Sequence, residues 1–191
     1  MQPATELTDP DRVLSERARL GVRGAFDALV VRYQARAYRL AWRMTGNRSD
    51  AEEIVQEAFL RAHRAMGTFH GDSRFGTWLY RIVVNEALMR KRAAARRPTQ
   101  SLDEPLRGAD GDWSIGAEHL LEQKRVTQLV RDALDTLDGA QRAALVLRDL
   151  EGLSSEEAGE ILGVQPETVR QRAHRARLKL RGLLGHLADA A

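Results

Sequence analysis

Apolar residues recur along most of this chain every three or four positions, and the strict alternation typical of β-strands is almost absent. This spacing indicates amphipathic α-helices, so we expect an all-α protein. In an N-terminal block the pattern predicts helices near residues 11–20, 24–45, 50–66 and 75–96. In a C-terminal block it predicts helices near residues 118–137, 139–150, 155–162 and 166–185.

The helical periodicity stops between the two blocks. Residues 98–117 contain two of the five prolines, three glycines and an excess of acidic side chains, a composition typical of a linker. We therefore expect two small helical domains, residues 11–97 and 118–186, joined by a flexible linker at 98–117 and preceded by a loose tail at 1–10. Trp113 is the lone aromatic residue of the linker and a candidate anchor on a protein surface.

Short signals mark several helix ends. Ser154, followed three residues later by Glu157, predicts a capping box at the start of the helix near 155–162. Ser49, followed by Glu52, similarly predicts the start of the helix near 50–66. Pro166 suits the first turn of the last helix, because its missing N–H would have no helical partner there.

The last predicted helix has two unlike faces. Val169, Ala173, Ala176 and Leu180 fall on one side, which is thin enough for close approach to another helix. The segment 170–181 contains six Lys or Arg residues and no acid, whereas an ordinary solvated face mixes both signs. A basic helix after a short turn is typical of a recognition helix in a DNA major groove. The candidate DNA-contacting residues are Arg170, Gln171, His174 and Arg175 on the outer side, with Arg177 nearer the flank and expected to touch phosphate.

The helix near 50–66 carries an acidic and amide-bearing face. Glu53, Gln56 and Glu57 are spaced i, i+3 and i+4, so they share one side. The simple alternative is a solvated face whose acids favour the positive helix N-terminus. That alternative explains Glu52 better than Glu57, so we favour a protein partner for this face.

Aromatic and basic residues mix in the segment from Phe69 to Asn85. Trp78, Arg81 and Asn85 are spaced i, i+3 and i+7 and share a helix face beside a polar loop. Such a face suits an unstacked nucleic-acid base, which offers its ring and its Watson–Crick edge. Core packing stands as an equal alternative for Trp78 and Tyr80.

Further basic residues follow on the same predicted helix. Arg90, Lys91 and Arg92, with two arginines at 96 and 97, place five basic residues in eight positions without an acid. We expect a phosphate-contacting ridge that adds affinity without reading sequence.

Composition narrows the class of protein. The chain has no cysteine, its net charge is only +3, and no apolar run approaches membrane-spanning length. The polar N-terminus does not resemble a secretory signal. The five histidines are scattered, and no phosphate-binding loop or nucleophile motif is present. We therefore expect a cytoplasmic protein that is not an enzyme and has no metal, no cofactor and no membrane span.

Two segments carry a specific resemblance to a known family. Residues 26–92 contain DAEEIVQEAF, FHGDSRF and TWLYRIVVN in that order, and they closely resemble region 2 of bacterial RNA polymerase sigma factors. Residues 134–181 resemble region 4 of the same family. The match is to the extracytoplasmic-function (ECF, group 4) subfamily, whose fold is two small helical domains. The resemblance implies an alternative sigma factor that binds core RNA polymerase and directs promoter-specific initiation.

The resemblance also implies roles for individual residues. Glu53, Gln56 and Glu57 would grip the coiled coil of the polymerase β′ subunit, and the β subunit would be a further contact. Phe69 and Asn85 would line the pocket for a flipped base of the −10 element, beside the loop that contains Asp72 and Arg74. The recognition helix would bind the −35 element, and an anti-sigma factor would hold the protein inactive. In the family the linker threads the polymerase near its active-site cleft, although an ordinary solvated tether is the safer interpretation of residues 98–117.

A competing hypothesis is a self-sufficient helix-turn-helix regulator that binds operator DNA as a dimer. It needs a dimerisation or effector domain, and the first block has neither coiled-coil heptads nor a pocket-like sandwich pattern. Binding of the isolated protein to duplex promoter DNA discriminates between the two, because a sigma factor binds such DNA poorly without core polymerase.

Overall fold

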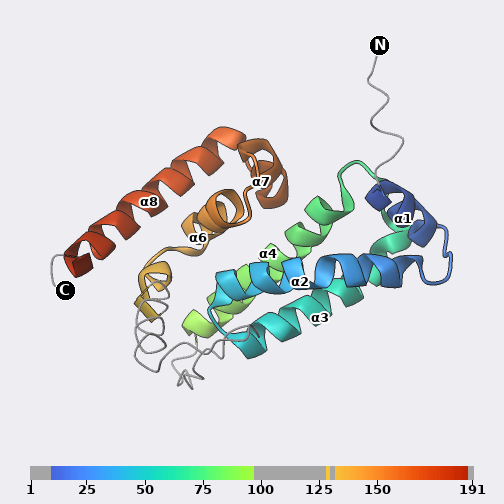
Figure 1. The fold of residues 1–191 in the computed structure, drawn as a ribbon, viewed down its shortest axis with the longest axis horizontal. Helices are drawn as coiled ribbons and strands as arrows, with labels where there is room; N and C mark the ends of the chain where they lie inside the picture. The colour runs from blue at the N-terminus through green and yellow to red at the C-terminus, as the bar shows by residue number, and fades with distance from the viewer. Residues whose placement is uncertain (1–9, 97–127, 130–131, 189–191) are drawn as a thin grey trace, which may run out of the picture.

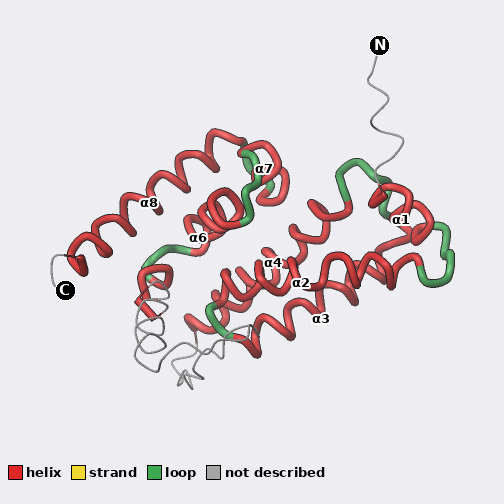
Figure 2. Tube along the Cα trace, viewed as in Figure 1, coloured by secondary structure: helices red, strands yellow, loops and turns green. Residues whose placement is uncertain are grey.

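The computed structural model describes residues 10–96, 128–129 and 132–188. This part of the chain contains helices and loops and no β-strand, as Figure 2 shows, which confirms the all-α prediction. The predictions for residues 1–9, for the linker at 98–117 with Trp113, and for much of the helix near 118–137 lie outside the described residues. Within that last helix, residues 128–129 and 132–135 are helical.

The N-terminal block packs its helices around one apolar core (Figure 1). Leu29, Tyr33, Ala37, Leu40 and Met44 are buried along one side of the second helix, as its periodicity predicts. Buried apolar side chains of the third and fourth helices complete this core. The elements are α1 (Pro10–Arg19), α2 (Ala25–Thr45), α3 (Arg48–Ala65), the short 3₁₀ helix η2 (Met66–Thr68) and α4 (Phe75–Arg96).

The turn between α2 and α3 differs from the prediction. Gly46 ends α2 in the left-handed conformation, with φ of 74°. Asn47 then caps α3 directly, and its side-chain oxygen accepts a hydrogen bond from the Asp50 amide at 3.0 Å. The prediction that Ser49 starts this helix was therefore wrong. Asn47 is as good a cap as serine, and its place directly after Gly46 lets α3 begin at once.

The C-terminal block consists of α6 (Gly139–Leu145), the π-helical segment η3 (Val146–Leu150), α7 (Ser155–Leu162) and α8 (Pro166–Ala188). The sequence predicted one regular helix over 139–150, but the spacing of the backbone hydrogen bonds widens after Leu145. The Glu151 amide bonds the Val146 carbonyl at 2.9 Å, five residues back. The widened turn presents the Leu150 carbonyl and the Glu151 side chain to α2, where both meet Arg43.

The helix-turn-helix follows its sequence signals closely. Ser154 and Glu157 form both hydrogen bonds of the capping box at the start of α7. Gly163 ends α7 with φ of 65°. Gly159 lies inside α7 and lets the following turn approach closely, because a Cβ there would come within 2.7 Å of the Val164 carbonyl oxygen. The sequence analysis did not single out this glycine.

The two blocks pack against each other. One continuous cluster of buried apolar residues joins the core of α2, α3 and α4 to Val146, Leu147 and Ile161 of the C-terminal block. At α6 the approach is close, since a Cβ on Gly139 would lie 2.8 Å from Cδ2 of Leu88. α8 lies on the outer side of the C-terminal block, with α6 and α7 between it and the N-terminal helices (Figure 1). Its basic face is therefore open, whereas part of α4 is covered.

Candidate functional site

The outer face of α8 is the most accessible candidate DNA-binding surface. Its opposite side is buried as predicted, with Val169, Ala173 and Ala176 at 1% exposure or less. That burial fixes the rotation of the helix about its axis, so the outer side chains must point to solvent. Among the described residues, Gln171, His174 and Arg175 are exposed and make no ion pair or hydrogen bond.

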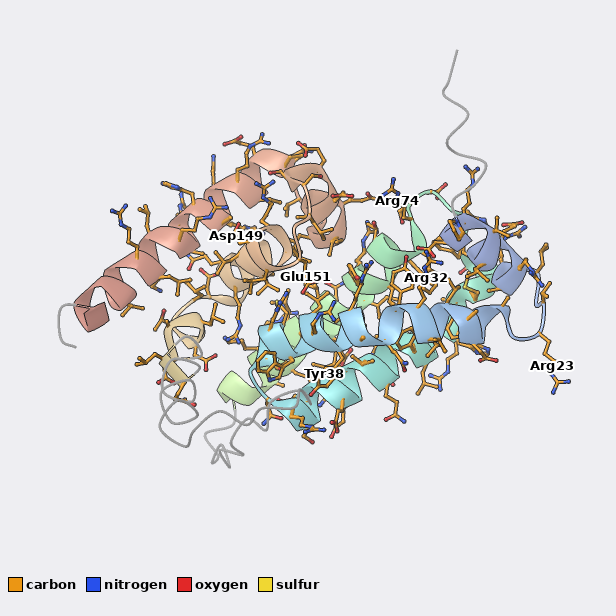
Figure 3. The ribbon with its side chains drawn as sticks, viewed as in Figure 1. Arg23, Arg32, Tyr38, Arg74, Asp149 and Glu151 are labelled. Atoms are coloured by element: carbon orange, nitrogen blue, oxygen red, sulfur yellow. The ribbon has the colours of Figure 1, made fainter. Side chains whose placement is uncertain are left out.

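Two other arginines of α8 are engaged within the protein. Arg170 pairs with Glu167, one turn away, and lies 3.6 Å from Glu156 at the start of α7. Arg177 makes two parallel hydrogen bonds to Asp149 of η3, at 2.8 and 2.6 Å. Figure 3 labels Asp149 where η3 faces α8. Arg177 therefore contacts a DNA phosphate only after it exchanges the Asp149 carboxylate for it, whereas Arg175 has no such partner among the described residues.

The acidic face of α3 is present as the spacing predicted. Glu53 and Gln56 are exposed and Glu57 is half-exposed on one side of the helix. Arg90 of α4 donates to Glu53 at 2.7 Å, and Arg61 of α3 donates to Glu57 at 2.7 Å. The hydrogen bond from Arg61 lowers the pKa of Glu57, so this carboxylate stays charged in mildly acidic solution. The face combines fixed carboxylates with a free amide.

An aromatic group lies beneath the start of α4. The Phe69 and Trp78 ring centroids are 4.9 Å apart, and the Phe75 ring meets both edge-on. Phe69 and Phe75 are buried at 7% and 2% exposure, whereas Trp78 is half-buried. Phe69 is thus a core residue in this structure, where it supports Trp78 from below. Core packing describes Tyr80, at 8% exposure, better than base stacking.

Asn85 is exposed, one turn beyond Arg81 on α4, and among the described residues its side chain has no partner. An unpaired amide on a rigid helix offers a donor and an acceptor to a base edge. Asp72 and Arg74 are also exposed, in the loop before α4, and Figure 3 shows Arg74 at the end of α4 that lies toward α7. Trp78 and Asn85, about two turns apart on α4, and this loop therefore have accessible polar or aromatic groups along one end of the helix.

Arg81 is not free like Asn85. Its Nη2 donates to the Glu160 carbonyl of α7 at 2.6 Å, across the boundary between the two blocks. The C-terminal block thus occupies one of the side chains that the spacing of Trp78, Arg81 and Asn85 brought together. The sequence could not reveal this contact, because it joins residues 79 positions apart.

Arg90, Lys91 and Arg92 do not form one ridge, because successive helical residues point about 100° apart. Arg90 turns to α3 and Arg92 is exposed, donating only to the Leu88 carbonyl of its own helix. Lys91 turns to the C-terminal block, where it lies 3.5 Å from Asp135. Burial lowers the pKa of Lys91, aided by the nearby Arg142 charge and opposed by Asp135. Arg92 is the one member of the three that starts with its charge unpaired among the described residues.

Polar contacts between the blocks involve residues that the sequence analysis missed. Arg43 of α2 bonds the Leu150 carbonyl at 2.7 Å and pairs with the Glu151 carboxylate at 2.6 Å. Arg142 of α6 is only 1% exposed, pairs with Asp135, and donates Nε to the Arg43 carbonyl at 2.9 Å. An arginine inside the apolar run of residues 139–147 was the available signal, because a buried guanidinium needs specific partners.

Within the described ranges no group of three or more His, Asp or Glu side chains is arranged to hold a metal ion. No helix in that part of the chain is long and apolar enough to span a bilayer.

Comparison with known proteins gives matches along most of the chain. Residues 29–97 match the family described as Sigma-70 region 2, and residues 127–180 match Sigma-70, region 4. The chain is 41% identical over 174 residues to the ECF RNA polymerase sigma-E factor of Escherichia coli (strain K12), covering 87% of this chain and 90% of that protein. It is 37% identical over 175 residues to the RNA polymerase sigma-H factor of Pseudomonas aeruginosa, covering 88% and 91%.

Among solved structures, CnrH in complex with the cytosolic domain of CnrY is similar, with a TM-score of 0.69 and 31% sequence identity. The similarity covers 93% of this chain and 99% of that chain, so it extends over both helical blocks. A structure of the sigma factor RpoE with the anti-sigma factor NepR from Bartonella quintana shares the fold, with a TM-score of 0.66 and 24% identity.

Proposed function

Because the chain belongs to the ECF RNA polymerase sigma factors, we propose that its exposed helix faces divide the work of promoter recognition. The protein directs promoter-specific initiation of transcription, as sigma factors do. Sigma factors are DNA-binding initiation factors, so RNA synthesis itself belongs to the polymerase. What the residues of this chain contribute is binding to the polymerase and to two promoter elements.

The acidic face of α3 binds core polymerase in this proposal. Glu53, Gln56 and Glu57 contact the β′ coiled coil, and the β subunit contacts the protein elsewhere. This assignment is supported by the fixed carboxylates of the face, which lie on a protein that also binds DNA. Their negative charge would repel DNA phosphates, whereas a basic surface on a protein partner would complement it.

The start of α4 captures the −10 element. Trp78 offers a half-buried ring for stacking on an unpaired base, and Asn85 offers hydrogen bonds to its edge. Asp72 and Arg74 flank the base, and Phe69 supports Trp78 from the core. Arg92, whose charge is unpaired among the described residues, contacts the DNA backbone, and Lys91 and Arg81 add to it when they leave Asp135 and Glu160. Arg90, the third residue of the predicted ridge, stays with Glu53 of α3.

The outer face of α8 binds the −35 element. The exposure of this face is the observation that best supports the proposed function. Gln171, His174 and Arg175 project from a helix whose rotation is fixed by the buried Val169, Ala173 and Ala176. Arg175 reads bases, because a free guanidinium can bond guanine O6 and N7 together. Arg170 and Arg177 position the helix on phosphates after exchanging their carboxylate partners.

We propose that residues 11–97 form the region 2 domain and residues 118–186 the region 4 domain, with 98–117 as the linker. The family matches at 29–97 and 127–180 support this division. The 41% identity to an ECF RNA polymerase sigma-E factor is the support for placing the chain in group 4. The protein acts in the cytoplasm, where bacterial polymerase and promoter DNA lie. An anti-sigma factor holds it inactive; the similar protein CnrH was solved in complex with the cytosolic domain of another protein, CnrY, which supports a protein partner for this fold.

Binding of labelled promoter DNA, measured with and without core polymerase, tests the proposal. We expect sequence-specific binding only when the protein and core polymerase are both present. Specific and dimeric binding of the isolated protein to duplex DNA would instead favour a self-sufficient helix-turn-helix regulator. Arg175→Ala is the matched variant, since it should reduce binding to promoters with an intact −35 element and spare promoters in which that element is scrambled.

A further inference from the structure

Glu86 of α4 is a buried carboxylate outside the surfaces described above. Its residue exposure is 9%. A buried carboxylate is costly unless it is paired, so its partners determine what it does. The sequence places it between Asn85 and the buried Ala87, with no motif to mark it.

The partners of Glu86 are two arginines from two helices. Arg61 of α3 brings Nη2 to 3.0 Å from Oε2, an ion pair without the alignment of a hydrogen bond. Arg90, one turn along α4, brings Nε to 4.0 Å from Oε1. The two guanidiniums therefore approach different oxygens of the same carboxylate.

Each arginine also reaches outward to the acidic face of α3. Arg61 donates Nε to Glu57 Oε1 at 2.7 Å. Arg90 donates Nη1 to Glu53 Oε2 at 2.7 Å and lies 3.4 Å from Asp50. The hydrogen bond with Glu57 and then the charge of Glu86 raise the pKa of Arg61, so both carboxylates act on the same guanidinium.

We infer that Glu86 is a positioning residue for the acidic face of α3, acting through Arg61 on Glu57 and through Arg90 on Glu53. The inference rests on the proposed function, in which that face binds core polymerase. Glu86 restrains the inner side of each arginine, so that the outer side holds a carboxylate in one orientation. The four carboxylates around two guanidiniums keep the face net negative. Pre-organised side chains lose less conformational entropy on binding a partner.

A purely structural role is the competing explanation, in which Glu86 only fastens α4 to α3. A purely electrostatic role is another, in which Glu86 only adds negative charge to the region. One substitution separates positioning from electrostatics. Arg61→Gln removes a positive charge and leaves Glu86 in place, so electrostatics alone would tighten binding to a basic partner. Positioning predicts the reverse, because Glu57 loses the group that holds it.

The experiment measures the Kd of the full-length protein for core polymerase by competition against the labelled wild-type protein. Glu86→Gln should raise the Kd about fivefold, which is ~1 kcal/mol. Glu86→Asp keeps the charge with a shorter reach and should recover part of the loss. Arg61→Gln should also raise the Kd. Glu52→Gln is the matched control, since it removes the same charge from α3, where Glu52 pairs with Arg48 alone among the described residues. It should change the Kd less than about twofold.

The decisive comparison is the background that carries both Glu53→Gln and Glu57→Gln. In that background Glu86→Gln should have no further effect on the Kd, because the carboxylates of Glu53 and Glu57 that it positions have been replaced. An equal loss in that background would show a structural role, and tighter binding by Arg61→Gln would show an electrostatic one; either result overturns the inference. If Glu86→Gln does not fold, Glu86→Asp and Arg61→Gln carry the same comparison, because Arg61 is half-exposed.

The same variants also distinguish failure of the proposed function from failure of the inference about Glu86. If the Glu53→Gln, Glu57→Gln protein binds core polymerase like the wild type, the acidic face is not the binding surface and the inference falls with it. If that protein binds weakly while Glu86→Gln and Arg61→Gln both bind normally, the face is correctly assigned and only the role of Glu86 is wrong.

Discussion

Arg81 of α4 and Glu160 of α7 are joined directly, because the Arg81 guanidinium donates to the Glu160 carbonyl at 2.6 Å. This bond ties the helix proposed to capture the −10 element to the helix-turn-helix proposed to bind the −35 element. Arg43 and Glu151 make a second link across the same boundary, at 2.6 Å. Turning the Arg81 guanidinium fully onto a phosphate of the −10 element would break this bond and remove one of the links that hold the two blocks together.

We therefore predict that the distance between α2 and α8 increases when the protein joins core polymerase at a promoter. The chain has no cysteine, so single cysteines can be introduced at the exposed Val31 and Leu178 and labelled. Energy transfer or spin-label distances should show a short distance in the free protein and a longer one in the initiation complex. An unchanged distance in an active complex would show that the two blocks bind the promoter elements without separating.

Asn85→Ala should impair promoter opening more than initial binding of duplex promoter DNA. A base-capture pocket acts on unpaired DNA, and its contacts offset an unstacking cost of a few kcal/mol. A template with a pre-melted bubble should restore most of the activity. Met89→Ala, at an exposed position one turn further along α4, is the control and should behave like the wild type on both templates. Equal defects of Asn85→Ala on both templates would show that Asn85 acts structurally.

Arg175→Ala should relax base preference at one or two positions of the −35 element, with about 1–3 kcal/mol of discrimination lost. Arg175 is free among the described residues and lies on the outer face. Selection of binding sites by the holoenzyme measures this effect. The same consensus and the same base penalties for the variant would mean that Arg175 only positions the helix.

Arg177→Ala should behave differently, because Arg177 is held by Asp149 in the free protein. The pair is partly exposed, so we expect a stability loss of only about 0.5–1 kcal/mol. Binding should weaken by the same factor on all −35 sequences. The slope of log affinity against log salt concentration should flatten by less than about one unit, the value for a phosphate contact whose arginine has no partner in the free protein. A change in base preference would refute this division between the two arginines.

Gly159→Ala should destabilise the helix-turn-helix by about 1–3 kcal/mol, since the new methyl group meets the Val164 carbonyl at 2.7 Å and backbone must move. Gly182→Ala is the matched control in α8, where a Cβ meets nothing within 4 Å. That change should stabilise the helix by up to about 1 kcal/mol. Urea unfolding of both variants measures the two signs, and equal stabilities would show that the turn has room for the methyl group.

The helices and their buried faces could be predicted because both depend on local spacing. Val169, Ala173 and Ala176 follow the helical period and are buried together. The start of α3 was misplaced because Asn47 and Ser49 are both good caps, and only the position of Gly46 decides between them. The contact of Arg81 with Glu160 and the partners of Arg142 could not be predicted, because they depend on how the two blocks pack. Arg90 and Lys91 were expected on one surface, but successive residues of a helix point about 100° apart, and these two face different elements.

Run-off transcription with purified core polymerase tests the central claim most directly. Templates are promoters enriched by selection with the holoenzyme, with and without scrambled −35 and −10 elements. The account predicts transcripts from a discrete start site only when the protein, core polymerase and both elements are present. Transcription that does not depend on the added protein, or that survives scrambling of both elements, would contradict it.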